Sequence, residues 1–106
     1  MSITVSVIGG RYAPMVLCDT CGKALTNPGM AVVAYDLRGE GDREPIMAHK
    51  GACHEVVDKR IRDEGGFPGW SELGTWIANL LHNAGLDDDE LARAQDSAAL
   101  FAELGI

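Results

Sequence analysis

The sequence predicts an α+β protein in which short β-hairpins and one helix are followed by a pair of helices. Apolar residues recur at strand period early in the chain and at helical period after residue 52, and two pairs of metal-ligand residues flank a β-branched segment. A length of 106 residues and an apolar content of 46% suit a single domain, residues 1–106. Within it, we expect residues 11–64 to form a metal-binding module and residues 70–105 a helical hairpin.

The first element is predicted to be a strand or a β-hairpin. Residues 3–7 alternate apolar and hydroxyl side chains, which is the period of a β-strand. Gly9 and Gly10 then provide a turn before residues 11–17. A loosely ordered N-terminus is the alternative interpretation.

A second hairpin is predicted between the two ligand pairs. Residues 30–37 form a β-branched run that begins after Pro28–Gly29 and ends at a polar, glycine-bearing tip, residues 38–43. Residues 45–49 then return antiparallel to this run. The hairpin would bring His49 back to the end of the sheet where the first cysteines lie.

Two helices are predicted to follow the second hairpin. The first runs from Ala52 to about Glu64, where two glycines stop it, and residues 65–69 have the composition of a short linker. Ser71 is expected to be the N-cap of a second helix that extends through Asn83.

A third helix is expected to begin at the acidic residues 87–90, because carboxylates stabilise a helix N-terminus. It ends before Gly105, and like the helix before it, it carries an apolar stripe at helical spacing. The stripe of the last helix consists of Leu91, Ala94, Ala98, Phe101 and Leu104. We therefore expect an αα-hairpin whose apolar faces pack together.

Two short motifs supply four metal-ligand side chains. Cys18 and Cys21 are separated by two residues and followed by Gly22, so that two sulfurs can hold one ion from a tight turn. After a further 27 residues, His49 and Cys53 supply a second pair. Three thiolates and one histidine complete a tetrahedral shell, so we expect one structural Zn²⁺.

Each ligand pair has an alternative interpretation. His54 is the rival fourth ligand because it is adjacent to Cys53, but His49 has the more usual reach and is favoured. The knuckle cysteines could instead form a Cys18–Cys21 disulfide. Three cysteines would then leave one thiol over, so the odd number favours a metal.

The Cys-x-x-Cys-Gly knuckle, the hairpin and the second ligand pair at a helix start resemble a treble-clef zinc finger over about residues 16–64. The ligand order Cys, Cys, His, Cys is also similar to that of LIM and poly(ADP-ribose) polymerase fingers. Three residues separate the second pair here, where those two families typically have two. The resemblance implies the fold type and the ligand roles of Cys18, Cys21, His49 and Cys53.

Charge limits the classes of partner. The net charge is −7, and residues 1–64 hold eight basic against nine acidic side chains, whereas residues 65–106 hold one against seven. Neither part has the basic excess that phosphate-backbone binding needs, although many treble clefs contact DNA or RNA. Another protein, or self-association through the C-terminal helices, is the expected partner.

Function and location are also expectations at this stage. No apolar run approaches the roughly 20 residues of a membrane-spanning helix, so we expect a cytoplasmic protein without a membrane partner. Four protein ligands leave no coordination position open for substrate or water, so we expect no enzymatic activity. The predicted function is a non-enzymatic protein–protein interaction or adaptor module, and a nucleic-acid-binding zinc-finger regulator is the alternative.

Overall fold

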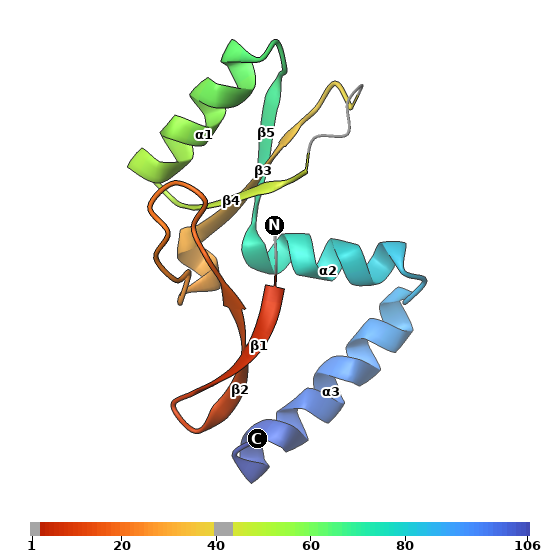
Figure 1. The fold of residues 1–106 in the computed structure, drawn as a ribbon. Helices are drawn as coiled ribbons and strands as arrows, with labels where there is room; N and C mark the ends of the chain where they lie inside the picture. The colour runs from red at the N-terminus through yellow and green to blue at the C-terminus, as the bar shows by residue number, and fades with distance from the viewer. Residues whose placement is uncertain (1–2, 40–43) are drawn as a thin grey trace.

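The computed structural model describes residues 3–39 and 44–106, which form an α+β fold with two small antiparallel sheets and three α-helices (Figure 1). The strands are β1 (Ile3–Ile8), β2 (Arg11–Val16), β3 (Ala31–Asp36), β4 (Ile46–His49) and β5 (Pro68–Glu72). The helices are α1 (Ala52–Asp63), α2 (Leu73–Asn83) and α3 (Asp88–Leu104), and a 3-10 turn, η1 (Pro28–Met30), precedes β3. The α+β class expected from the sequence is confirmed.

The N-terminal segment forms a regular hairpin. Strands β1 and β2 pair antiparallel from Ile3 opposite Val16 to Ile8 opposite Arg11. The two residues between the strands are Gly9 and Gly10, with φ of 60° and 79°. A two-residue turn with positive φ at both positions matches the twist of the strands it joins, and glycine adopts it without strain. The alternative of a loosely ordered N-terminus is not what the structure shows.

The second sheet has the strand order β4-β3-β5, and all its pairings are antiparallel. Residues 31–34 of β3 are all buried, so both faces of this central strand are covered. Helices α1 and α2 both pack against β3. The expected tip of the β3–β4 hairpin, residues 38–43, lies outside the described residues at positions 40–43.

Strand β5 occupies a segment that was expected to be a linker and a helix cap. Gly69 permits the pairing with β3, because a Cβ at this position would lie 2.7 Å from Cγ of Leu37. The Ser71 hydroxyl lies 3.0 Å from that of Tyr35 across the strand pair, and so does not cap a helix. Helix α2 starts one residue later than expected, with Glu72 at the N-cap position. The N-cap prediction was therefore wrong, and only residues 65–67 of the expected linker connect α1 to β5, because Pro68 and Gly69 belong to the strand.

The buried core lies between the second sheet, α1 and the start of α2. Helix α1 contributes Val57 and Ile61, and α2 contributes Leu73. The buried residues are Val16, Cys18, Leu25, Ala31, Val32, Val33, Ala34, Ile46, Met47, Ala48, Val57, Ile61 and Leu73. The N-terminal hairpin adds only Val16, and α3 adds none.

The two C-terminal helices form as expected, but their apolar faces do not close on one another. Asp87 caps α3 by accepting a hydrogen bond of 2.8 Å from the backbone N–H of Glu90. Helices α2 and α3 then diverge (Figure 1). An apolar pocket of about 260 Å³ lies between them. Its lining includes four small residues, Gly74, Ala78, Ala94 and Ala98, which leave the space unfilled.

No helix in the described part of the chain is both long and apolar enough to cross a membrane.

Candidate metal centre

The first two cysteines lie on a tight turn whose backbone is closed by hydrogen bonds. The N–H of Cys18 donates to the carbonyl of Lys23 at 2.9 Å, and the N–H of Gly22 donates to the carbonyl of Cys18 at 2.8 Å. Gly22 has a φ of +76°, which other residues rarely adopt. This turn is called the knuckle (residues 18–22), and it presents Cys18 and Cys21 to the same side.

The knuckle docks on the outer edge of β4. The N–H of Asp19 donates to the carbonyl of Met47 at 2.7 Å, and the N–H of Met47 donates to Oδ2 of Asp19 at 2.8 Å. The Thr20 hydroxyl donates to the carbonyl of Cys53 at 3.0 Å. These three bonds connect the first cysteine pair to the two elements that carry the second pair.

The second pair lies where β4 turns into α1. His49 is the last residue of β4, and Cys53 is the second residue of α1. Gly51 allows the sharp turn between them, with a φ of +91°, and its carbonyl accepts the first helical hydrogen bond from Glu55 at 3.0 Å. The strand end and the first helical turn therefore place two side chains next to the knuckle.

The structure brings together the four residues singled out from the sequence. The ligand atoms of Cys18, Cys21, His49 and Cys53 all lie within 4.8 Å of one another. Zn–S and Zn–N bonds of about 2.3 and 2.05 Å at a tetrahedral angle require a sulfur-to-nitrogen separation of about 3.6 Å. The observed distance from Cys21 Sγ to His49 Nδ1 is 3.5 Å. The donor set therefore suits a tetrahedral ion, with Nδ1 as the histidine ligand atom.

Electrostatics within the group also favour a cation. Burial by itself raises the pKa of the Cys18 thiol, but neighbouring backbone N–H groups, that of Cys21 first, stabilise the thiolate and lower the pKa to about 6. Burial and the adjacent Cys18 sulfur raise the pKa of Cys53 to about 11. Ionising one thiol thus opposes ionising the next, and a divalent cation would relieve this repulsion.

The alternative ligand assignments receive less support from the geometry. His54 lies outside the four-residue group; its Nε2 is 3.1 Å from Oδ1 of Asp58, and its ring packs edge-on against Trp70 with centroids 5.5 Å apart. All three cysteines are free thiols, so the Cys18–Cys21 disulfide is not formed. Neighbouring residues on a helix point in different directions, which separates His54 from Cys53.

Two residues that hold the centre together were missed by the sequence analysis. Asp19 and Thr20 were treated only as spacers between Cys18 and Cys21, although both make the docking bonds of the knuckle. The available signal was their polarity, because short polar side chains inside a turn commonly bond to nearby backbone. Their partners on β4 and α1 depend on the tertiary fold.

Comparisons with models of protein families, with curated proteins and with solved structures find no match to this chain.

Proposed function

We propose that this protein is a small zinc-binding module of the treble-clef type that acts in protein–protein interaction or as an adaptor, without catalysis. The observation that carries the proposal is the group of Cys18, Cys21, His49 and Cys53, with ligand atoms within 4.8 Å. Four such ligands close the coordination shell of one Zn²⁺ and leave no site for substrate. A closed shell suits a structural ion, which stabilises a fold rather than activating water.

The order of elements supports the treble-clef assignment. The knuckle is followed by the antiparallel pair β3–β4 and then by α1, whose first turn carries Cys53. The knuckle precedes the β3–β4 hairpin and the start of α1 follows it, so the two ligand pairs meet at the same end of the hairpin. Zinc bound here would connect residues that are 35 positions apart, from Cys18 to Cys53, and would fix the core strands between them.

The surface outside the core supports an interaction role. Large apolar side chains are exposed on the N-terminal hairpin, on α2 and on α3. They include Val5, Val7, Tyr12, Leu80, Leu81, Leu100, Phe101 and Leu104. This amount of exposed apolar side chain on a small domain is consistent with contact with another macromolecule.

The surface charges make nucleic acid the weaker candidate. Lys50, Lys59 and Arg60 are each paired with a nearby acid, at 2.6, 2.7 and 3.5 Å respectively. A paired lysine or arginine releases fewer counterions when it contacts a phosphate, because its charge is already partly balanced. The described residues of α3 add further negative charge, so a protein partner is the better match.

The test combines metal analysis with capture of a partner. Protein purified without added metal should contain one zinc per chain, and the cobalt-substituted protein should show the absorption of a tetrahedral thiolate site. Replacing His49 should alter that absorption, whereas replacing His54 should not. A metal-free but fully folded protein would remove the basis of the proposal.

The interaction role is tested with the same protein as bait in extracts of its native cell. A partner identified by mass spectrometry is then purified and mixed with wild type, Cys21→Ser and the control Lys23→Ser. We expect stoichiometric complexes with wild type and the control, and none with Cys21→Ser. Specific hydrolysis of a substrate would contradict the adaptor role and indicate an enzyme. Tight, sequence-selective binding of an oligonucleotide at physiological salt would instead indicate a nucleic-acid-binding regulator.

A further inference from the structure

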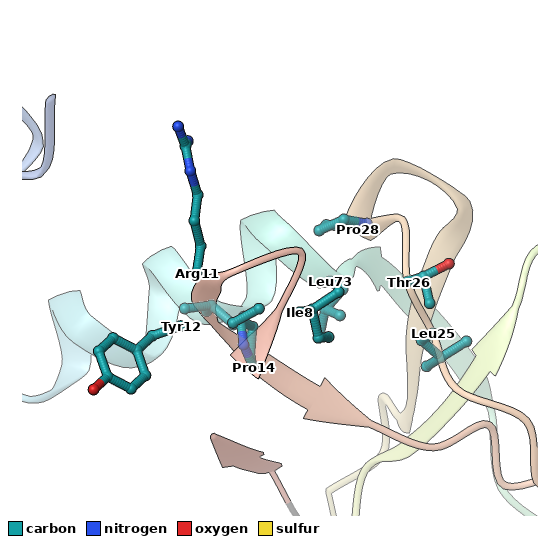
Figure 2. A pocket seen from close by; sticks show the side chains of 10 residues that line it. Ile8, Arg11, Tyr12, Pro14, Leu25, Thr26, Pro28 and Leu73 are labelled. Carbon is teal, nitrogen blue, oxygen red and sulfur yellow. The ribbon is translucent and has the colours of Figure 1, made fainter. Parts of the chain in front are cut away.

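One face of the N-terminal hairpin is apolar and largely exposed in the half next to the turn, while its other end is buried in the core at Val16. Cross-strand partners share a face, so Val5 and Val7 lie on the same side as Pro14 and Tyr12, which they oppose. Val5, Val7 and Tyr12 are 74%, 66% and 69% exposed. Tyr12 and Pro14 also border the pocket that the hairpin forms with α2 (Figure 2). We call these four residues the hairpin face.

The two strands of the hairpin by themselves contribute little to its stability. It is a separate two-stranded sheet, and such a sheet is marginally stable in water unless its apolar face packs on something. A pocket of about 370 Å³, lined in part by Ile8, Pro14 and Leu73, separates it from the start of α2 (Figure 2). Strand β1 also has an unprotected outer edge, without proline or charge, of the kind that pairs with other chains.

The total exposed area points to an interface of substantial size. The chain exposes 7150 Å², whereas a compact monomer of 11.3 kDa exposes about 5,700 Å². Two copies that each buried this excess would remove about 2,800 Å² from water, which lies in the range of obligate homodimers. The radius of gyration of 15.5 Å, against about 13 Å for a compact chain of this length, agrees with this.

The charges indicate which partner fits. The hairpin face carries no charged residue, and the exposed end of α3 beside it is held by Arg11, whose Nη2 donates to the carbonyl of Ala102 at 3.4 Å. The acids of the tail are concentrated at the other end of α3, in residues 87–90. An uncharged face is complementary to an equally uncharged face. Docking through this face would also keep the acidic residues 87–90 of the two copies apart. A basic partner would be drawn to residues 87–90 instead.

We propose that a second copy of this chain docks on the hairpin face to form a symmetric dimer, with the apolar end of α3 at the rim of the interface. The inference rests on the interaction role proposed above and names the partner. In a two-fold dimer each side chain of the face occurs twice in one interface. A single substitution there consequently introduces two buried changes.

Sedimentation equilibrium of the zinc-loaded full chain tests the proposal. The expected mass is twice 11.3 kDa, and Val7→Glu should raise the dissociation constant of the dimer by about a hundredfold or more, because it buries two carboxylates. Val56→Glu is the matched control, since Val56 is 56% exposed on α1, and it should leave the constant unchanged. A wild type that stays monomeric at high concentration overturns the proposal, as does a dimer that is insensitive to Val7→Glu.

If Val7→Glu fails to fold, as shown by loss of zinc, the proposal is tested by amide hydrogen exchange of the wild type at several concentrations. Amide exchange in β1 should slow as concentration rises through the dissociation constant, while exchange in α1 should not change; equal behaviour of both elements overturns the proposal. The adaptor role is judged separately by capture of a partner. A monomer that captures one refutes the dimer alone, and a dimer that captures none refutes the adaptor role alone.

Discussion

Replacing Cys21 with serine should destabilise the protein through loss of the metal rather than loss of packing. Cys21 is exposed in the structure, whereas Cys18 is only 1% exposed and contributes to the core. Exchanging sulfur for oxygen at Cys21 therefore removes little buried apolar surface but deletes one ligand of the proposed zinc site. Lys23→Ser, two residues further along, provides a control that leaves all four ligands intact.

The expected loss of stability is large for a core of this size. A four-ligand structural zinc contributes roughly 10–16 kcal/mol near neutral pH, so one ligand accounts for about 2.5 kcal/mol as a lower bound. At 4–8 °C per kcal/mol for a small domain, the unfolding midpoint should fall by about 10 °C or more. Among the residues that the structure describes, thirteen are buried in the core and three of these are alanine, so complete removal of zinc should unfold residues 16–64.

Three measurements decide the outcome: zinc content by elemental analysis, thermal unfolding by circular dichroism, and amide exchange with and without a strong chelator. We expect the amides of β3, β4 and α1 to lose protection with the metal. Helices α2 and α3 should keep partial helicity, although isolated helices of their length are marginal. If β3, β4 and α1 stay protected after verified removal of zinc, the ion is peripheral and the reasoning is refuted.

Three further predictions follow from the packing and the charges. Asp19→Ala should cost about 1.5–3 kcal/mol of unfolding free energy in denaturant titration, because Met47 loses a charged acceptor, and Asp19→Asn should cost less; equal losses would contradict the role of the carboxylate. Ile61→Ala, at a site with no exposure, should cost about 2–5 kcal/mol, against under about 0.5 kcal/mol for Val56→Ala on the same helix. Fluorescence titration with duplex and single-stranded oligonucleotides should show weak, strongly salt-dependent binding, since no excess of basic residues is present.

The parts of the fold that the sequence predicts correctly are those determined by short-range patterns. The turn at Gly9 and Gly10 needs positive φ at two neighbouring positions. Because glycine adopts positive φ readily, two adjacent glycines predict this turn from the sequence. The grouping of Cys18 and Cys21 with His49 follows from a tight turn at one end and a hairpin of matching length between the pairs. Each of these inferences depends on residues close in sequence or on one strand pairing.

Strand β5 shows where such reasoning fails. Pro68 and Gly69 are poor strand formers, so local propensity indicates a linker. The segment nevertheless pairs with β3, because Gly69 leaves room for Leu37 and the N–H of Leu37 donates to the carbonyl of Phe67 at 2.8 Å. Gly69 allows two segments of the chain to lie close together in the folded protein. Because these segments are distant in sequence, no local pattern predicts the contact.

The tail shows a different failure. Helix α3 carries the predicted apolar stripe. Such a stripe indicates that one face of the helix tends to be buried, but it does not indicate which element or partner covers that face. Small side chains at Gly74, Ala78, Ala94 and Ala98 leave a pocket between the helices instead of a packed seam. The sequence therefore predicted the helices correctly, but an apolar stripe on each helix allows the two faces to pack together without requiring it.

The distribution of the core links the metal centre to the uncovered surfaces. Apart from Val16, the buried residues belong to the second sheet, to α1, to the start of α2 and to the segment that holds Cys18 and Leu25. Helix α3 and most of the N-terminal hairpin contribute nothing to this core. Zinc can therefore stabilise the fold without help from these elements, whose apolar side chains remain available for a partner. Substitutions in the two regions should consequently have separable effects: Cys21→Ser should lower stability, and Val7→Glu should lower association while zinc stays bound.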